Sequence, residues 1–471
     1  MESNYLAFLK MKFPNFILLL VAGMAVYAIS VVESGCAQIG APTGGPKDTI
    51  PPVLLKAEPK DSTLNFKGNK IVLTFDEYVQ LINAQQTLLV NPTPKINPNV
   101  DYKLKTVTVK IRDTLEPNTT YRLDFGNSIA DNNEGNPYKN FSYIFSTGSY
   151  IDSLKFRGKV TLAETGKADS TILVFLYKNP DDSAVYKQKP RFVARVDSAG
   201  KFMFYNLPGG VYHIYALKDE SGQRTYTRND ELFAFSDSAV IVSDSVKPIE
   251  LYAYYQEKPL TKPKTSSAAP EKKLKYTTSL NSGKQSILDS LIITFNNKLK
   301  NFDSSKIQLT DTLHNAYNAS VSLDTTGKII TLKNKWLDNT DYRLVISKDF
   351  ATDTLGVGLL KSDTVKFKTE KETDYGSIII NFKNLGKYKN PVLQFVSNNV
   401  VVKSYPLTSG SLNVKLFNPG SYDLRILEDM NNNGVWDPGN YHLKIQPEKV
   451  FSIPQKFSVR ANWDNEKDIV L

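Results

Sequence analysis

Short segments in which apolar and polar residues alternate recur along nearly the whole chain. Residues 105–111 and 328–333 are clear examples, and β-branched residues fill many of their apolar positions. Such a period of two residues predicts strands that are buried on one face. Turn formers, such as those in 116–118 and 207–210, separate the segments at short intervals. The pattern predicts an all-β chain of tandem β-sandwich domains.

The alternating segments also repeat, with an offset of about 220 residues. One module contains 71–75 and 121–123, and its second copy contains the similar segments 291–295 and 342–344. A different module, found at 200–219 and again at 411–429, has a Pro-Gly turn, a tyrosine and then an aspartate. The expected order is ABAB, with these bounds: signal segment 1–35, Pro/Gly-rich tether 36–52, domain A1 53–149, domain B1 150–255, linker 256–275, domain A2 276–370 and domain B2 371–471.

The linker 256–275 is rich in proline, lysine, serine and alanine. This composition is typical of an extended segment, which at this length could span at most roughly 66 Å. We therefore expect the two AB pairs to move relative to one another. The joins within each pair are short, so each pair is expected to behave as one rod.

A tyrosine in each A module is expected to have a structural role. Residues 115–121 have the L-x-P-x-T-x-Y form of a tyrosine corner, in which the hydroxyl of Tyr121 bonds to backbone a few residues upstream. The second copy lacks the proline and one residue, so Tyr342 should keep the contact in a looser turn.

The N-terminal region has the layout of an export signal that ends at the only cysteine, Cys36. Lys10 and Lys12 precede an apolar run over 16–32, and two small residues stand directly before the thiol. The run is also about long enough to span a bilayer, so a retained anchor helix is one alternative. The other alternative is that Cys36 is an idle buried thiol. Residues 34–36 resemble the lipobox at which bacterial lipoproteins are cut and their cysteine is acylated.

Two residues modify this interpretation. Glu33 stands where the lipobox usually has an apolar residue, and Met11 could be the true start instead of Met1.

Further motifs carry a family resemblance. The A modules resemble S-layer-type Ig-like domains through the strand 71–75 and the Phe-x-Thr strand 145–147. The B modules resemble the prealbumin-like fold of carboxypeptidase regulatory and collagen-adhesin B-type domains through 200–212. Together with 36–46, the chain is similar to Ig-like-domain lipoproteins of Bacteroidetes-type envelopes. This implies a palmitate-bearing lipoprotein of the cell outer membrane, on either its periplasmic or its surface face.

The amino-acid composition limits the classes of partner and cofactor that we expect. The net charge is +10, but Lys and Arg are interspersed with Asp and Glu, and the only dense basic block lies in the linker, so nucleic acid is not expected as a partner. A single cysteine excludes an intramolecular disulfide. The three histidines, His213, His314 and His442, are far apart in the sequence, and no phosphate loop, dinucleotide fingerprint or nucleophile elbow occurs. We therefore expect that the protein is not an enzyme and that it has no certain cofactor.

One loop suggests weak Ca²⁺ binding. Asp429, Asn431, Asn433 and Asp437 place oxygen side chains at loop positions 1, 3, 5 and 9, with glycine at position 6. Asn440 replaces the usual glutamate at position 12, so the expected Kd is about 10⁻⁴ to 10⁻³ M. The alternative is an Asx-rich turn with Trp436 packed on the sandwich. The B1 counterpart, beginning at Asp219, keeps only the first ligand.

The many aromatic residues should mostly fill sandwich cores. Phe75, Phe145, Phe202 and Phe204 are expected inside or on paired strands, whereas Tyr226, Tyr254 and Tyr255 are the better candidates for exposed, sugar-binding faces.

The expected function is that of a lipid-anchored envelope protein with a non-catalytic binding or scaffolding role, whose partners are the membrane and an envelope protein or glycan. The alternatives are an accessory subunit of a hydrolase that degrades polysaccharide or protein, and a surface adhesin. Several carboxylates meeting in a pocket at an A–B join would favour the hydrolase, and smooth junctions would favour the scaffold.

Overall fold

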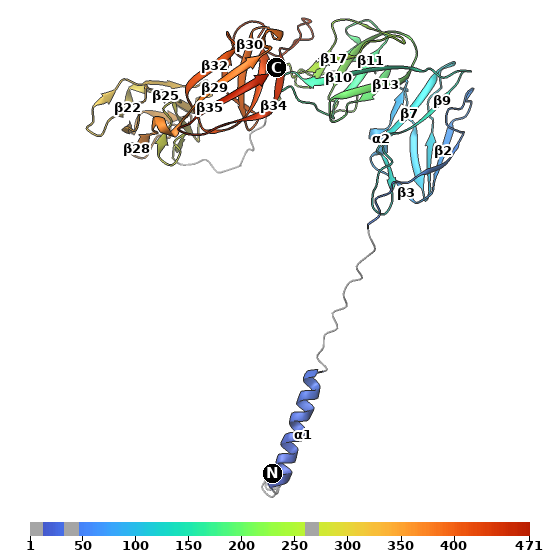
Figure 1. Ribbon diagram of the computed structural model, residues 1–471, viewed down its shortest axis with the longest axis horizontal. Helices are drawn as coiled ribbons and strands as arrows, with labels where there is room; N and C mark the ends of the chain where they lie inside the picture. The colour runs from blue at the N-terminus through green and yellow to red at the C-terminus, as the bar shows by residue number, and fades with distance from the viewer. Residues whose placement is uncertain (1–12, 33–46, 260–272) are drawn as a thin grey trace.

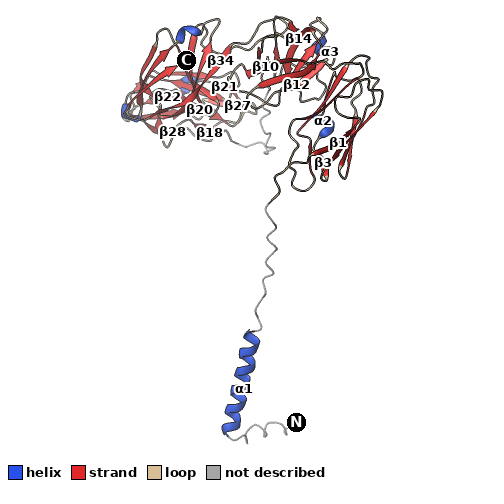
Figure 2. Cartoon of the chain, turned by 45° about the vertical axis from the view of Figure 1, so that its right-hand side comes forward, coloured by secondary structure: helices blue, strands red, loops and turns tan. Residues whose placement is uncertain are grey.

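The computed structural model describes residues 13–32, 47–259 and 273–471. Helix α1 (Phe13–Val32) stands apart from the rest of the described chain, whose regular elements are strands and helical turns of only three or four residues (Figure 2). The all-β class and the tandem sandwiches predicted from the alternating pattern are therefore confirmed.

Module A1 is a sandwich in which the antiparallel sheet β1-β2-β6-β5 faces the sheet β4-β7-β9, with the pair β3-β8 at one end. Its side chains alternate as predicted: Ile71, Leu73 and Phe75 of β2 are buried, and the residues between them are partly exposed. The elements are β1 (Leu54–Glu58), β2 (Lys70–Phe75), β3 (Val79–Leu81), α2 (Ala84–Thr87), β4 (Leu89–Asn91), β5 (Asn99–Lys103), β6 (Thr106–Lys110), β7 (Thr120–Gly126), β8 (Ile129–Asp131) and β9 (Phe141–Ser146).

Module A2 repeats this plan, with the sheet β18-β20-β25-β24 facing β19-β28-β26-β22-β23 and the pair β21-β27 at one end. Its elements are β18 (Tyr276–Thr278), β19 (Lys284–Gln285), β20 (Leu291–Phe295), β21 (Leu299–Phe302), η2 (Ser304–Lys306), β22 (Ile307–Thr310), β23 (Ala316–Tyr317), β24 (Ser320–Leu323), β25 (Ile329–Lys333), β26 (Asp341–Ile346), β27 (Ala351–Asp353) and β28 (Asp363–Thr369).

Module B1 has the sheet β13-β10-β17 packed on β12-β11-β14-β15, with β16 also paired to β14. Its first and last strands, β10 and β17, lie side by side in parallel register. The elements are β10 (Leu154–Leu162), β11 (Leu173–Tyr177), α3 (Ala184–Lys187), β12 (Phe192–Arg195), β13 (Lys201–Leu207), β14 (Gly210–Leu217), β15 (Phe233–Phe235), β16 (Val240–Val242) and β17 (Ile249–Ala253).

Module B2 follows the same topology, since β32-β29-β35 packs on β31-β30-β33-β34 and its first and last strands are again parallel. The elements are η3 (Glu372–Asp374), β29 (Gly376–Lys383), η4 (Leu385–Lys387), β30 (Pro391–Ser397), β31 (Val400–Pro406), β32 (Ser411–Phe417), β33 (Gly420–Glu428), β34 (Lys449–Val459) and β35 (Asp464–Val470).

The order of the modules in space differs from their order in sequence. Across Figure 1 they stand as A2, B2, B1 and A1, so that the two B modules are neighbours at the centre. Each module has its own apolar core, and a further buried cluster joins B1 to the loop between β33 and β34 of B2. This cluster contains Tyr215 and Phe233 of B1 and Tyr441 of B2.

Candidate functional site

The predicted lipidation site, Cys36, lies outside the described residues. Helix α1 covers most of the apolar run predicted to be the signal. Over the described parts of the sequence, no helix combines the length and hydropathy needed to cross a membrane. Signal cleavage and acylation therefore stay predictions.

Both predicted tyrosine corners have the expected geometry. The Tyr121 hydroxyl accepts a hydrogen bond from the Glu116 N–H at 2.8 Å, and the Tyr342 hydroxyl accepts one from the Leu337 N–H at 3.2 Å. The longer contact belongs to the copy without the proline, as the looser turn predicts. Burial raises the pKa of both phenols, so the hydroxyls stay neutral and bind backbone, which is a structural role.

A threonine completes each corner, and sequence reasoning missed it. Thr147 donates its hydroxyl hydrogen to the Glu116 carbonyl at 2.7 Å, and Thr369 donates to the Leu337 carbonyl at 2.6 Å. These threonines end the Phe-x-Thr strands. The repeated Phe-x-Thr motif therefore contained the threonine, but the motif was interpreted only as part of a strand.

The four residues of the predicted calcium loop come together in one turn. Asp429 is buried, and its carboxylate accepts hydrogen bonds from the N–H groups of Asn433 at 3.2 Å and Gly434 at 2.7 Å. Asp437 Oδ2 accepts one bond of 2.7 Å from each side-chain amide of Asn431 and Asn433. Over the described residues, no group of three or more His, Cys, Asp or Glu side chains is arranged to hold a metal ion. Calcium binding stays a prediction.

Glu448 closes this loop from the other end, and no local pattern pointed to it. Its carboxylate accepts hydrogen bonds from the N–H groups of Met430 at 2.6 Å and Asp437 at 3.0 Å. Burial, together with the charges of Asp429 and Asp437, raises the pKa of Glu448. The Trp436 indole donates to the Glu448 carbonyl at 2.8 Å, so the tryptophan packs on the sandwich as the alternative interpretation held.

The far part of the same loop inserts Tyr441 into B1. Tyr441 is only 2% exposed, and its ring lies 5.2 Å from that of Phe233 and 5.1 Å from that of Phe235. Its hydroxyl donates to the Tyr215 hydroxyl at 3.1 Å. Lys444 adds an ion pair of 2.6 Å with Asp182 of B1. Large buried aromatic residues of this kind dominate the energetics of interfaces.

Backbone contacts extend the interface between the B modules. The Val450 N–H donates to the Ala163 carbonyl at 3.1 Å, and the Ser452 hydroxyl donates to the Thr165 carbonyl at 2.9 Å. A side chain at Gly166, whose φ is +67°, would meet the Val450 carbonyl. The prediction that the two AB pairs move independently is therefore wrong, because it considered the linker alone and not this packed contact.

The same interface corrects the prediction of exposed aromatic faces. Tyr226 and Tyr254 are each 2% exposed, and Tyr226 stacks on Phe233 with ring centroids 4.1 Å apart. Tyr255 is partly buried against the B1 core. The phenylalanines predicted to be internal, Phe75, Phe145, Phe202 and Phe204, are all buried.

The join between A1 and B1 is held by polar contacts. Arg191 of B1 makes a bidentate ion pair with Glu116, at 2.5 and 2.6 Å, which lowers the pKa of that carboxyl. The Asn91 side-chain amide pairs with both backbone groups of Val193, each at 2.8 Å, as a neighbouring strand would. The A1–B1 pair is therefore a fixed unit, as the short join predicts.

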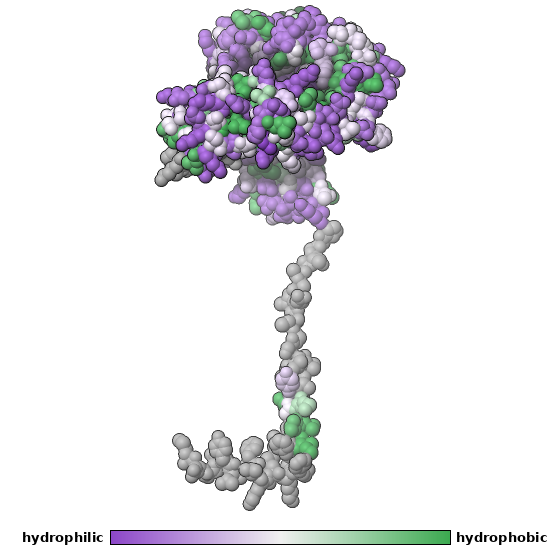
Figure 3. Space-filling view, turned by 90° about the vertical axis from the view of Figure 1, so that its left-hand side faces the viewer, coloured by the Kyte–Doolittle hydropathy of each residue, from purple (hydrophilic) through white to green (hydrophobic). Residues whose placement is uncertain are grey.

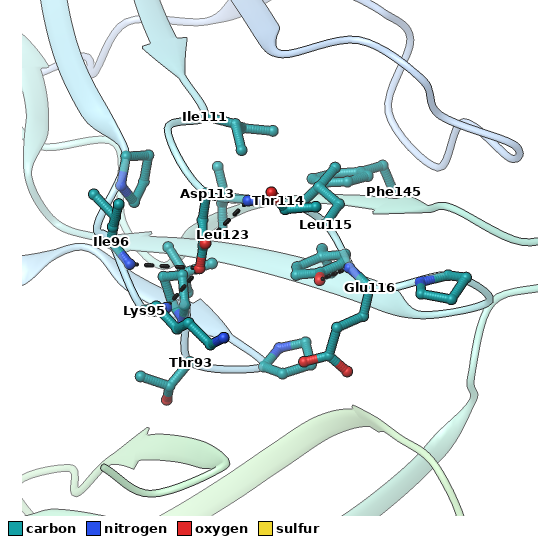
Figure 4. A pocket seen from close by; sticks show the side chains of 16 residues that line it. Thr93, Lys95, Ile96, Ile111, Asp113, Thr114, Leu115, Glu116, Leu123 and Phe145 are labelled. Atoms are coloured by element: carbon teal, nitrogen blue, oxygen red, sulfur yellow. Dashed lines mark hydrogen bonds between the residues drawn. The ribbon is translucent and has the colours of Figure 1, made fainter.

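A cavity of about 390 Å³ opens in A1 beside this join. Its lining includes Tyr121, Leu123 and Phe145, and a proline-rich segment over 92–98 forms one wall (Figure 4). Asp113 points into the cavity, but its carboxylate already accepts the Lys95 N–H at 2.6 Å. Proline and other apolar side chains make up most of the lining, so the cavity offers chiefly an apolar surface.

The comparisons with known proteins agree with this architecture. Residues 48–147 match the family described as "Bacterial Ig-like domain". The chain carries a bacterial Ig-like domain. No curated protein matches the sequence.

Solved structures similar to this chain have low overall scores. Escherichia coli alpha-2-macroglobulin, spanning its domains MG0-NIE-MG1, has a TM-score of 0.19 at 12% identity, over 38% of this chain and 71% of that one. BcpA, the major pilin subunit of Bacillus cereus, has a TM-score of 0.17 at 12% identity, over 67% and 99%. The N-terminal part of the bacterial S-layer protein SbsC has a TM-score of 0.16 at 14% identity, over 43% and 44%.

Proposed function

We propose that this Ig-like-domain protein is a lipoprotein of the bacterial outer membrane, anchored through acylated Cys36, whose four modules have a non-catalytic binding or scaffolding role. One observation carries the proposal: the only cysteine follows an apolar segment and two small residues, and a Pro/Gly-rich tether then leads to the first sandwich. Two or more acyl chains on one residue would hold the protein stably at a membrane.

The surface of the modules supports this role. Over the face seen in Figure 3 the modules are mostly hydrophilic, and hydrophobic residues are scattered in small groups. Scattered apolar residues of this kind are normal on a soluble protein surface. In this proposal the N-terminal segment, and not a surface of the modules, attaches the protein to the membrane.

The side chains at the A1–B1 join favour a binding role for the protein over a hydrolytic one. A polar cavity between A1 and B1 contains two carboxylates, Asp219 and Glu220, which are adjacent in one loop. Asp219 accepts hydrogen bonds from the Ser221 hydroxyl and the Arg224 N–H, and Glu220 lies 3.7 Å from the Lys218 ammonium group. Carboxylates used in this way do not form the opposed acid and base of a glycoside hydrolase.

Fractionation of cells that express a Cys36→Ala variant tests the anchor. We expect the wild-type chain to incorporate a labelled palmitate and to sediment with outer membranes, and the variant to lose both properties. A Glu33→Ala variant is the matched control, since an apolar residue there should leave acylation intact. Membrane retention of Cys36→Ala without the label would contradict the proposal and favour a retained anchor helix.

A further inference from the structure

The B1 loop that corresponds to the predicted calcium loop of B2 shares its first aspartate but has a different residue at its sixth position, Arg224 instead of glycine. In B2, Asp429 Oδ2 accepts the N–H of Gly434, and in B1, Asp219 Oδ2 accepts the N–H of Arg224 at 2.9 Å. Both N–H donors belong to residues with positive φ, +76° for Gly434 and +59° for Arg224. Glycine is the usual residue in this conformation, because a Cβ atom makes it unfavourable. B1 therefore holds an arginine where the backbone would accept glycine more readily.

The backbone of Arg224 is fixed at both of its polar groups. Besides the bond to Asp219, the Tyr177 hydroxyl donates to the Arg224 carbonyl at 3.3 Å. Strained backbone conformations that the surrounding structure holds in place concentrate at binding sites.

The side chain of Arg224, in contrast, has no protein partner. Among the described residues it makes neither a side-chain hydrogen bond nor an ion pair, although it is half-buried. Burial lowers the pKa of the guanidinium, as does the charge of Arg195, whereas Asp219 raises it. Arg195 differs because it has an ion pair of its own, 2.9 Å from Asp124. The charge of Asp219 reaches the guanidinium without forming an ion pair with it, so the guanidinium can pair with an external carboxylate or phosphate.

Arg224 lines a cavity of about 420 Å³ between A1 and B1. This volume is within the range of sites for small molecules. The remaining walls are mainly polar and include no aromatic side chain; they are formed by Gln85, Gln86, Leu89, Asn97, Leu173, Lys189, Asp219, Glu220, Ser221 and Gly222. Side-chain amides both donate and accept hydrogen bonds, as a ligand rich in hydroxyl groups requires.

The other charged side chains around the cavity do not pair with the Arg224 guanidinium. Asp219 is used by its own loop, and Glu220 lies beside Lys218. The Lys189 ammonium donates to the Lys95 carbonyl at 3.4 Å, which leaves its charge without a counter-ion at the cavity wall. An acidic group that enters would therefore meet two cations.

We infer that the A1–B1 cavity is a binding site for an acidic saccharide, whose carboxylate or phosphate pairs with the Arg224 guanidinium while its hydroxyl groups bond to the surrounding amides. Arginine suits this role because its planar fork binds carboxylate and phosphate groups through two parallel hydrogen bonds. The site deepens the binding role proposed above and rests on it, but it does not depend on the lipid anchor.

Calorimetric titration of the full chain in detergent tests the site with four probes: glucuronate, glucose 1-phosphate, glucose and inorganic phosphate. We expect at least one acidic sugar to bind at millimolar concentration or below and glucose to bind more weakly. The tighter of the two acidic sugars identifies the acidic group. In Arg224→Gly and Arg224→Gln the affinity should fall about tenfold or more, the loss expected for a charge-assisted hydrogen bond.

Thermal unfolding of the same variants separates a binding role from a structural one. Arg224→Gly should raise the Tm, because glycine relieves the left-handed conformation. Arg157→Gln is the matched control, since Arg157 is an exposed residue of the same module that does not line the cavity, and it should change neither affinity nor Tm. Absence of binding by both acidic sugars, unchanged affinity in the Arg224 variants, or equal binding of inorganic phosphate would each overturn the inference. None of these outcomes bears on membrane fractionation of Cys36→Ala, so failure of the site and failure of the anchor are distinguishable.

Discussion

The two B modules share a topology, but the loops that follow their long central strands have different uses. Each loop begins with an aspartate that accepts a hydrogen bond from the N–H five residues on. In B1 the loop leads back to β15 and turns Arg224 towards the join with A1. In B2 it is longer and carries Tyr441 into the neighbouring module. Duplication thus preserved the sheets, which are constrained by their cores, and left the loops free to acquire separate roles.

Removal of the Tyr441 side chain should have the largest effect, because it empties the centre of the interface between the B modules. A Tyr441→Ala variant is expected to lose about 3–5 kcal/mol of interface stability, the range for a buried aromatic residue. Denaturant unfolding, followed by tryptophan fluorescence, measures this loss. Trp463→Ala, at a side chain 61% exposed in B2, should change stability by less than about 0.5 kcal/mol. An equal, small effect of both variants would show that Tyr441 does not hold the modules together.

Calcium binding should give the second-largest effect, and it should distinguish the B2 loop that begins at Asp429 from the B1 loop that begins at Asp219. With a Kd of about 10⁻⁴ to 10⁻³ M, an addition of about 10 mM Ca²⁺ stabilises a site by about 1–3 kcal/mol. We expect calcium to raise the Tm of the full chain and Asp437→Asn to remove most of the rise. Asp219→Asn in the B1 loop should leave the rise intact, since that loop keeps only the first ligand. A wild-type Tm that is insensitive to calcium would remove the predicted site.

Substitutions at the tyrosine corners allow the stability of the two A modules to be compared. Replacement by phenylalanine leaves a backbone N–H without its acceptor, so Tyr121→Phe and Tyr342→Phe should each cost about 0.5–1.5 kcal/mol. The loss should be greater for Tyr121, whose contact is 2.8 Å against 3.2 Å. Thermal unfolding of the four-module chain measures both, with Tyr102→Phe, at an exposed position, as the control. A greater loss at Tyr342 would contradict the idea that the proline tightens the turn.

The ion pair at the A1–B1 join should give the smallest effect. Because Arg191 holds the pKa of Glu116 below its ordinary value of 4.5, the stabilisation is complete above that pH and is lost as the pH falls through the lowered pKa. The Glu116 side chain is 53% exposed, so solvent screening limits the effect to less than about 1 kcal/mol. The Tm difference between wild type and Glu116→Gln should therefore shrink as the pH is lowered from 7 into the acid range below 4.5. A Tm difference that does not change with pH would show that packing causes it, and not the ion pair.

Local patterns predicted what depends on local physics. The period of two in 105–111 and 328–333 predicted strands, and those segments form β6 and β25 with alternating burial. The L-x-P-x-T-x-Y motif predicted the Tyr121 contact, because donor and acceptor are close in sequence. Residues 48–147 match a bacterial Ig-like domain, the kind of domain expected for A1.

The spatial order of the modules could not be predicted in this way. It depends on Tyr441, which lies in a loop rich in Asn, Asp and Gly and has partners more than 200 residues away. The composition of such a loop indicates a turn or a cation site but does not show what the following residues contact. The exposure expected for Tyr254 was wrong for the same reason, since Gly439 of the other half of the chain lies against its ring. Tyr226 is covered within B1, by the rings of Tyr186 and Phe233.

Small-angle X-ray scattering of the chain from residue 37 onward tests most directly whether the two B modules form one fixed centre. We predict a single scattering profile that fits the order A2, B2, B1 and A1 of Figure 1, with a larger radius of gyration in Tyr441→Ala. A wild-type profile that requires two AB pairs moving independently, and that the substitution leaves unchanged, would contradict the account.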